Sequence, residues 1–205
     1  MEEQLDNKKP VVVGITGASG VVLAKSTIDR FLELDVPVIL TASSASRIVW
    51  EKEMETSFGE ELEKWSSSQN FKFHQIGELT APIASGTFPT RGMVIIPASM
   101  STVGALAQGL SDNLLRRAAD VSFKEKRTVV VVPRETPLHA VHLRNLSDLA
   151  FMGATILPPN PAFYLFQKSV NDVVDFIVER VMVLFGVVSE LPEGMQYKKD
   201  LFGDK

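Results

Sequence analysis

The chain has 205 residues, a hydrophobic content of 45% and a formal net charge of −4, which is enough apolar material for one substantial core. The acidic balance argues against a nucleic-acid-binding surface, because binding to a phosphate backbone needs clustered Lys and Arg. The lack of cysteine excludes disulfides, thiolate metal ligands and a catalytic thiol. The first ten residues are charged and no run reaches about 18 apolar residues, so we expect a cytoplasmic protein that neither is secreted nor crosses a membrane.

Apolar runs alternate with segments of helical periodicity along the chain. Strands are predicted over residues 11–16, 36–43, 91–99, 127–133 and 153–159. Helices are predicted over residues 19–34, 44–54, 101–110, 114–127, 137–153 and 169–185. This alternation is typical of βαβ crossovers, and continuous apolar strands suit a sheet that is covered on both faces. The fold class expected is therefore α/β, doubly wound, with a mostly parallel sheet and three layers.

Two segments depart from this alternation. Residues 56–69 are polar, lack a clean period and contain three consecutive serines, which predicts an exposed excursion rather than a domain boundary. After residue 188 the sequence is charged and interrupted by Pro and Gly, which predicts a tail that is mobile or orders against a neighbouring subunit. We expect one domain over residues 1–205, with its core at about 10–188 and a C-terminal tail at 189–205.

Small and hydroxyl-bearing residues follow the predicted strands. The stretches are Gly17-Ala18-Ser19, 41–44, 97–102 and 133–136. In an open parallel sheet ligands bind beyond the carboxyl ends of the strands, and helix N-termini there attract phosphates. The glycines of residues 14–20 are spaced G-x-x-G-x-x-G, unlike the dinucleotide and P-loop motifs, which disfavours NAD and ATP. The alternative is a tight turn followed by Ser and Thr helix caps.

Charged residues form two further groups. Arg134 and Glu135 directly follow a very apolar strand, where Arg can hold a phosphate in bidentate fashion and Glu can move a proton. Arg117, Lys124 and Arg127 fall on related faces of a predicted helix. For Lys124 and Arg127, a solvated helix face is the alternative to a binding role.

Three other motifs bear on the chemistry. His139 and His142 are three residues apart on a predicted helix, but no Cys and no convincing third ligand accompany them, so no metal site is expected. There is no G-x-S-x-G motif around Ser19, which argues against a hydrolase nucleophile. The string ILPPNPAFY ends on Tyr164 and is either a rigid wall that positions an aromatic hydroxyl or a surface connection.

Together these motifs resemble the UbiX-type flavin prenyltransferases, a branch of the flavodoxin-like flavoproteins. The matching strings are VGITGASG, IASGTF, GMVIIPASMSTVGALAQGLSDNLLRRAADVSFKEKR, VVVVPRETPLHAVHLRNL and GATILPPNPAFY. The order RRAAD, PRETPLH and PPNPAFY is the most specific part of the resemblance. It implies a flavodoxin-like or Rossmann-like fold and a homododecamer built from trimers, with sites at subunit junctions.

The resemblance also implies the ligands. Reduced FMN would be the prenyl acceptor, no metal would be required, and dimethylallyl phosphate would be the prenyl donor. The residues implied for FMN are Gly17, Ala18, Ser19, Ser43, Ser99, Met100, Ser101, Thr102 and Arg134. The phosphate of the donor would be held by Tyr164 and Arg180, with Lys124 and Arg117 nearby or contributed across a subunit boundary.

The implied reaction joins the dimethylallyl group to N5 and C6 of reduced FMN and makes prenylated FMN for a partner UbiD-type decarboxylase. Lys124 and Arg117 would stabilise the departing phosphate. Glu135 with Ser19 is the candidate proton relay, and Glu53 is a candidate for assisting at the phosphate or the allylic cation.

One departure and two alternatives remain open. Ser101 stands where many members of that family carry a lysine, which puts one phosphate contact or one subunit contact in doubt. An FMN-dependent cysteine-type decarboxylase would share the string Pro97-Ala98-Ser99 and could use His74, although PRETPLH and PPNPAFY argue against it. The other alternative is a non-catalytic flavin-binding subunit with the same fold.

Overall fold

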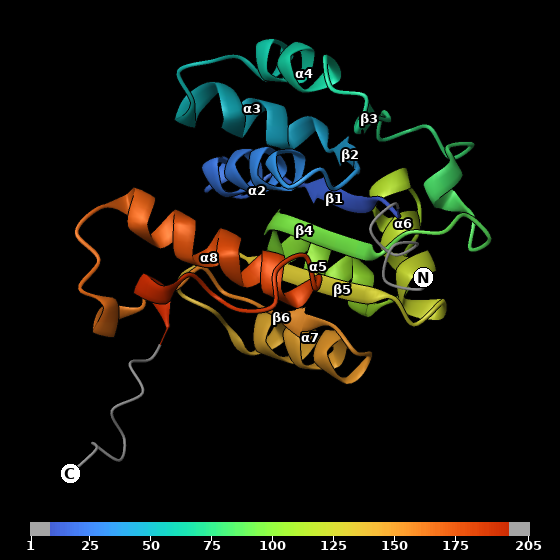
Figure 1. The fold of residues 1–205 in the computed structure, drawn as a ribbon. Coiled ribbons are helices and arrows are strands. Elements are labelled where there is room, and N and C mark those ends of the chain that lie inside the picture. The colour runs from blue at the N-terminus through green and yellow to red at the C-terminus, as the bar shows by residue number, and fades with distance from the viewer. Residues whose placement is uncertain (1–8, 197–205) are drawn as a thin grey trace.

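The computed structural model describes residues 9–196, and within them the sheet has six strands that all run parallel (Figure 1). The strands are β1 (Val11–Ile15), β2 (Val38–Ala42), β3 (Phe71–Phe73), β4 (Gly92–Ala98), β5 (Thr128–Pro133) and β6 (Thr155–Ile156). Their spatial order is β3-β2-β1-β4-β5-β6. Without the short edge strand β3, and with the other five strands renumbered in chain order, this is the order 2-1-3-4-5 of the flavodoxin-like fold. The order reverses between β1 and β4, which is the switch point of the sheet. The predicted fold class is confirmed.

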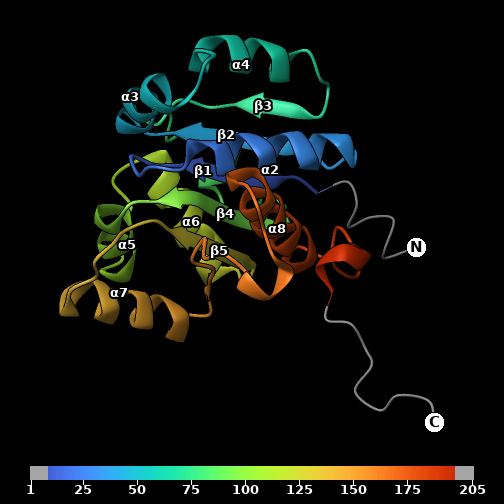
Figure 2. The same ribbon diagram turned by 90° about the vertical axis from the view of Figure 1, so that its left-hand side faces the viewer.

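Helices cover both faces of the sheet and complete three layers (Figures 1 and 2). The helices are α2 (Val21–Glu33), α3 (Ser44–Glu53), α4 (Phe58–Ser66), α5 (Met100–Ala107), α6 (Leu114–Lys124), α7 (Ala140–Phe151) and α8 (Val170–Leu184). Short 3₁₀ turns lie at η1 (Pro82–Ala84), η2 (Phe163–Leu165) and η3 (Glu193–Met195). The first core cluster includes buried residues of α2, α3, α4 and α8, and the second includes those of α5, α6 and α7.

The side chains of each strand alternate between the two faces of the sheet, and this explains why the apolar runs are continuous. Val11 and Val13 belong to the core cluster on one face of the sheet, whereas Val12 belongs to the cluster on the other. Val94 and Ile95 divide in the same way on β4. Because successive side chains of a strand point to opposite faces, a strand buried on both sides must be apolar at every position.

Residues 58–66 form the helix α4, so the prediction of an exposed excursion over 56–69 is wrong for most of its length. Trp65 is only 2% exposed, and its indole N–H donates to Asp29 Oδ1 at 2.7 Å. Its ring lies edge-on to that of Trp50, with 5.9 Å between centroids. The apolar residues Phe58, Leu62 and Trp65 have the i, i+4, i+7 spacing of one helix face, and the many charges between them obscure that period.

Strand β3 is absent from the sequence-based prediction. It has three residues and pairs only with β2, at the edge of the sheet. Helix α7 begins at Ala140, three residues later than predicted, and His139 is its N-cap. Of the predicted C-terminal tail, residues 197–205 lie outside the described residues. Over residues 9–196, no helix has the length and apolar character needed to span a membrane.

Candidate active site

The loops that follow β1, β4 and β5 are joined by hydrogen bonds at the carboxyl edge of the sheet. The Thr16 hydroxyl donates to the carbonyl of Pro97 at 2.8 Å and accepts the backbone N–H of Ser99 at 2.7 Å. The backbone N–H of Arg134 donates to the carbonyl of Ala98 at 3.2 Å. These bonds cross the switch point between β1 and β4, which is where doubly wound sheets bind ligands. The strand ends singled out in the sequence therefore form one surface.

Helix α3 lies along the loop that follows β1. A Cβ atom on Gly17 would come within 2.5 Å of the Cβ atom of Ala45, in the first turn of α3. At the other end of α3, Glu53 Oε2 accepts the backbone N–H groups of Gly20 at 2.8 Å and Val21 at 3.1 Å. The Glu53 carboxylate thus caps the N-terminus of α2, next to the loop that contains Ser19.

Serine hydroxyls begin the helices after β2 and β4. Ser43 caps α3, and Ser99 caps α5 by accepting the backbone N–H of Thr102 at 3.3 Å. Met100 is 8% exposed and packs in the core, while Ser101 is exposed. Met100 can therefore serve a ligand only through its backbone N–H, which in the first turn of a helix lacks an intrahelical acceptor.

A cavity of about 320 Å³ opens beyond the carboxyl ends of β5 and β6. It is lined by Pro133, Arg134, Glu135, Thr136, Leu138, Leu146, Pro158, Pro159 and Asn160. Nε of Arg134 is buried and has no hydrogen-bond partner among the described residues. Glu135 is exposed, and its Oε1 accepts the backbone N–H of Thr136 at 3.0 Å. The wall of the cavity thus includes an arginine whose buried Nε is unpaired, a glutamate and two prolines of the Pro-rich string.

Tyr164 and Arg180 do not line this cavity among the described residues. Tyr164 lies in η2 and is 61% exposed, and Arg180 is exposed on α8. Pro158 and Pro159 of the same Pro-rich string do line it. Two prolines of the predicted wall therefore line the cavity, whereas the Tyr164 side chain is exposed on the surface of the single chain.

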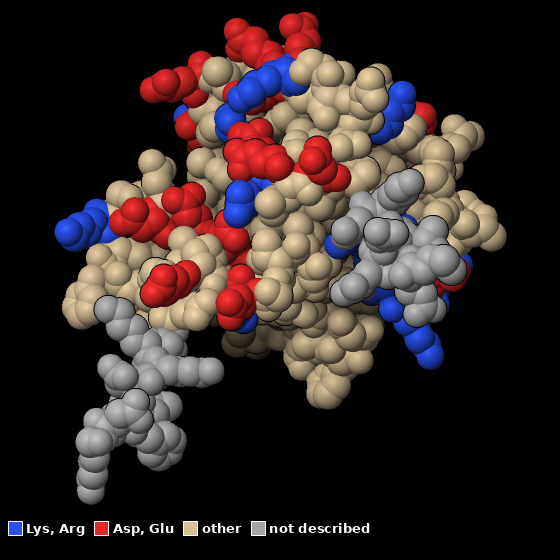
Figure 3. All heavy atoms as spheres, in the orientation of Figure 1, with Lys and Arg blue, Asp and Glu red and all other residues tan. Residues whose placement is uncertain are grey.

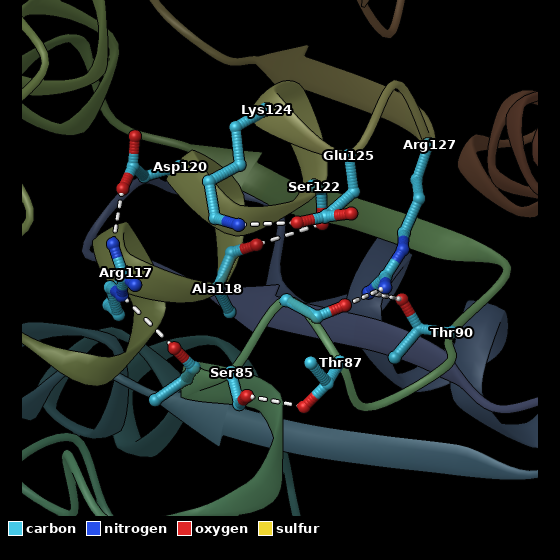
Figure 4. A network of polar contacts seen from close by, with 12 residues as sticks. Ser85, Thr87, Thr90, Arg117, Ala118, Asp120, Ser122, Lys124, Glu125 and Arg127 are labelled. Carbon is cyan, nitrogen blue, oxygen red and sulfur yellow. Dashed lines mark hydrogen bonds and ion pairs between the residues drawn. The ribbon is translucent and has the colours of Figure 1, made fainter.

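Arg117 of α6 and Arg127, which follows the end of α6, contact the loop of residues 84–90 (Figure 4). Arg117 Nε donates to the carbonyl of Ala84 at 3.1 Å, and its Nη1 pairs with Asp120 at 2.7 Å. Arg127 donates to the carbonyl of Gly86 at 2.6 Å and to Thr90 Oγ1 at 3.1 Å. Arg127 is therefore not part of a solvated helix face, since its guanidinium is bound by the loop. The sequence string IASGTF carries this loop, but its spacing alone assigns the loop no role.

Lys124 pairs with Glu125 at the C-terminus of α6, also against this loop (Figure 4). The Lys124 ammonium holds the pKa of the Glu125 carboxyl below its usual range. Because α6 leads into the amino end of β5 and Arg134 follows its carboxyl end, Lys124 and Arg134 lie at opposite ends of this strand, which is about 20 Å long at roughly 3.3 Å per residue. A single chain does not bring Lys124 together with Glu135.

No group of three or more His, Asp or Glu residues within 9–196 is placed to hold a metal ion. The rings of His139 and His142 stack with 3.5 Å between centroids. His139 Nδ1 accepts the backbone N–H groups of Val141 at 3.2 Å and His142 at 3.4 Å. His74 is 8% exposed and contacts Glu78 Oε1 through Nδ1 at 2.9 Å. The histidines therefore serve as a helix cap and as partners in local contacts.

Comparison with known proteins identifies the relatives of this chain. Residues 1–182 match the family model described as Flavoprotein. The flavin prenyltransferase UbiX of Synechocystis sp. is 45% identical over 184 residues, which cover 85% of this chain and 89% of that protein. The flavin prenyltransferase LpdB of Lactiplantibacillus plantarum is 42% identical over 186 residues, covering 89% of this chain and 95% of the relative.

Solved structures agree with these relatives. AnUbiX (PadA1), crystallised in complex with FMN and dimethylallyl pyrophosphate, aligns with a TM-score of 0.82 and 35% identity, covering 87% of this chain and 93% of that chain. A dodecameric FMN-dependent UbiX-like decarboxylase from Escherichia coli aligns with a TM-score of 0.85 and 36% identity, covering 92% and 99%. The chain belongs to the flavoprotein family and, within it, to the UbiX-type flavin prenyltransferases.

Proposed function

We propose that this protein transfers the dimethylallyl group of dimethylallyl phosphate to N5 and C6 of reduced FMN, and so makes prenylated FMN for a UbiD-type decarboxylase. The observation that carries the proposal is the Arg134 side chain, which lines the cavity together with Glu135 and whose Nε is buried without a hydrogen-bond partner. A buried donor without a partner is costly, and an anionic ligand at this position offsets that cost. Named flavin prenyltransferases with 35–45% identity over most of the chain support the reaction.

The carboxyl edge of the sheet fits FMN. Arg134 supplies a charged donor, and Ser43, Ser99 and Thr102 supply hydroxyls at strand ends or helix starts. We assign FMN binding to Gly17, Ala18, Ser19, Ser43, Ser99, Met100, Ser101, Thr102 and Arg134. Ser101, which replaces the lysine of many relatives, offers a hydroxyl and a backbone N–H in the first turn of α5. Binding of the FMN phosphate then depends more on backbone N–H groups than on a second cation.

Reduced FMN supplies the nucleophilic N5 and C6 atoms of the reaction. The C–O bond of the donor breaks, its electron pair leaves with the phosphate, and the two new bonds form to carbon. N5 and C6 each lose a proton, while the phosphate and the alkene carbon each gain one. We assign Glu135 with Ser19 to this proton movement, because Glu135 lines the cavity. Glu53, whose carboxylate lies beside the Ser19 loop, is assigned to stabilising the allylic cation.

The departing phosphate needs positive charge and hydrogen-bond donors. We assign Tyr164, Arg180, Arg117 and Lys124 to this role. Because Lys124 and Arg134 lie at opposite edges of one chain, the proposal requires a neighbouring subunit to supply Lys124 and Arg117. The dodecameric state of a solved relative supports this arrangement, and we propose a homododecamer of single flavoprotein domains whose core spans about residues 10–188.

The mass of the flavin product tests the proposed function. Purified protein is incubated anaerobically with reduced FMN and dimethylallyl phosphate, and the flavin is then released and weighed by mass spectrometry. We expect FMN to gain one C5H8 unit, and we expect no gain when dimethylallyl phosphate is omitted. Bound FMN of unchanged mass would contradict the proposal in favour of a non-catalytic flavin subunit. Carbon dioxide release from a C-terminal cysteinyl peptide would instead indicate a cysteine-type decarboxylase.

A further inference from the structure

Arg127 bonds two separate points of the loop of residues 84–90 (Figure 4). Its Nη2 donates to the carbonyl of Gly86 at 2.6 Å, and its Nη1 donates to Thr90 Oγ1 at 3.1 Å. Thr90 is only 7% exposed, so the second bond lies at the buried end of the loop. Because a guanidinium presents its N–H groups in a rigid planar fork, these two bonds fix the loop relative to the end of α6.

The loop in turn orients Arg117 of α6. Nε of Arg117 donates to the carbonyl of Ala84 at 3.1 Å, and its Nη1 donates to Asp120 Oδ2 at 2.7 Å. An arginine carries five N–H groups, and these two bonds leave those of Nη2 without a partner among the described residues. The guanidinium is therefore held by one acceptor of the loop and one of the helix, and it keeps donors for a ligand.

Gly86 leaves the space in which the Lys124 ammonium lies. A Cβ atom on Gly86 would overlap the ammonium of Lys124 and the carboxylate of Glu125, which pair with each other. The backbone of Gly86 is not in the left-handed region, so the missing side chain matters here for space and not for conformation. The pKa of the Glu125 carboxyl is lowered first by Lys124 and also by the charge of Arg127. The loop and the charged groups thus form one connected cluster.

We propose that Arg127 is a positioning residue for the departing phosphate, because it clamps the loop of residues 84–90 against α6. The clamped loop holds Arg117 and Lys124, the two cations of this cluster assigned to that phosphate, in place before the donor binds. The inference rests on the proposed function and adds a residue that does not itself contact the donor. Cations that are already ordered lose less side-chain entropy when they bind a ligand. The subunit that supplies Lys124 to a neighbour supplies the clamp with it.

The test measures the use of the two ligands separately in the full chain. The KM for dimethylallyl phosphate comes from the rate at which reduced FMN gains C5H8, and the dissociation constant of oxidised FMN comes from fluorescence quenching. Both are measured for the wild type and Arg127→Ala. Arg116→Ala is the matched control, because it removes the same charge from α6 at a position whose guanidinium pairs with Asp112 instead of the loop.

Two loop variants separate the clamp from the charge of Arg127. Thr90→Val has nearly the same shape, removes one acceptor of the clamp and leaves the arginine in place. Gly86→Ala keeps the arginine and crowds Lys124, and its cost to folding is small because the crowded atoms are the ends of flexible side chains. Since both variants keep Arg127, they remain informative where Arg127→Ala does not fold.

We expect the KM for dimethylallyl phosphate to rise about tenfold in Arg127→Ala, the order set by losing hydrogen bonds to a charged group. It should also rise in Thr90→Val and Gly86→Ala and stay unchanged in Arg116→Ala, with FMN bound equally well by all four variants.

An unchanged KM in Arg127→Ala overturns the inference, as does an equal loss of FMN affinity, which would indicate a general structural role. A KM that rises in Arg127→Ala but in neither loop variant overturns it too, because the charge would then act without the loop. Failure of the wild type to form prenylated FMN would instead contradict the proposed function.

Discussion

Arg134 and Glu135, which follow the end of β5, differ in how deeply the fold buries their side chains. Arg134 is drawn into the cavity wall, with its Nε buried and unpaired, whereas Glu135 remains exposed with one oxygen accepting the N–H of Thr136. A buried unsatisfied donor costs about 1–3 kcal/mol, which favours binding of an anion. An exposed carboxylate beside it keeps the freedom to exchange a proton with a bound ligand or with water.

Replacing Arg134 tests the proposed anion contact. We expect Arg134→Ala and Arg134→Lys each to weaken FMN binding at least tenfold. Alanine removes the charged donor, and the lysine ammonium lacks the planar guanidinium that donates two parallel hydrogen bonds to one ligand group. Fluorescence titration with FMN measures the effect, and Arg144→Ala, an exposed position on α7, is the control. Equal affinity in all four proteins would refute the contact.

Replacing Glu135 separates flavin binding from proton transfer. We expect Glu135→Gln to bind FMN with the wild-type affinity and to form prenylated FMN at least 100-fold more slowly, because general acid–base groups typically contribute about 10²–10⁴ in rate. Single-turnover mass spectrometry of the flavin gives the rate, and fluorescence titration gives the affinity. Wild-type turnover in this variant would show that another group moves the proton.

At the scale of elements, α3 and α4 position the first turn of the site. Trp50 of α3 packs edge-on against Phe58 and Trp65 of α4, with ring centroids 5.4 and 5.9 Å away. The indole N–H of Trp65 then bonds Asp29 of α2. These contacts join α4, α3 and α2, so α3, which carries Glu53, is held in place by packing against α4.

Removing the Trp65 side chain should loosen this junction. We expect Trp65→Ala to lower the free energy of unfolding by about 3–5 kcal/mol, the usual cost of a buried aromatic-to-alanine change. Urea denaturation followed by circular dichroism measures the loss, with the exposed Lys64→Ala of the same helix as control. Most surface substitutions change the free energy of unfolding by no more than about 0.5 kcal/mol. A loss below about 1 kcal/mol in Trp65→Ala would therefore mean that α4 does not anchor the site.

The start of α8 carries a titratable cap. Asp172 Oδ2 accepts the backbone N–H groups of Lys168 at 2.7 Å and Ser169 at 3.0 Å, while the Ser169 hydroxyl accepts the N–H of Asp172. These bonds, the one from Lys168 first, hold the pKa of Asp172 below its usual range. Since the folded state favours the carboxylate, the contribution to stability is complete above the ordinary Asp pKa and is lost as the pH falls toward the lowered one.

Thermal melts at several pH values test this cap. We expect Asp172→Ala to melt below the wild type at pH 7 and the difference to shrink as the pH falls below about 4, where an unfolded Asp begins to protonate. Asp175→Ala, an exposed position on the same helix, is the control and should show no such trend. A difference that stays constant down to pH 2 would assign the effect to helix propensity.

At the scale of the molecule, acidic residues gather on one face, and large apolar side chains are exposed on either side of Tyr164. Figure 3 shows Asp and Glu gathered on the face that carries α2, α4 and α8. Nucleic-acid binding needs clustered Lys and Arg, so this face does not suit it. Phe163 and Phe166 flank Tyr164 and are each 83% exposed. Exposed apolar side chains in such numbers are typical of interaction surfaces. The apolar surface around Tyr164 therefore fits a subunit interface.

Mixing two inactive variants tests the shared site. Alone, we expect Lys124→Ala and Glu135→Gln each to lack prenyltransferase activity. Co-expressed in one assembly, they should recover part of it, because some interfaces pair the intact Lys124 of one chain with the intact Glu135 of another. The assay is the C5H8 gain of FMN, and each variant expressed alone is the control. No recovery from mixed assemblies would place both residues in one chain's site.

By itself, the sequence determined the doubly wound fold and the family, and it predicted the carboxyl edge of the sheet as the ligand edge. Its strands are long apolar runs, and the family motifs are contiguous strings, so both are local signals. It did not determine α4, whose period is hidden by charges, or β3, which is too short to stand out. Only the tertiary structure decided that Arg134 has an unpaired donor, that Lys124 lies at the opposite edge, and that Glu53 caps α2. Such facts depend on contacts between residues tens of positions apart, which no local pattern encodes.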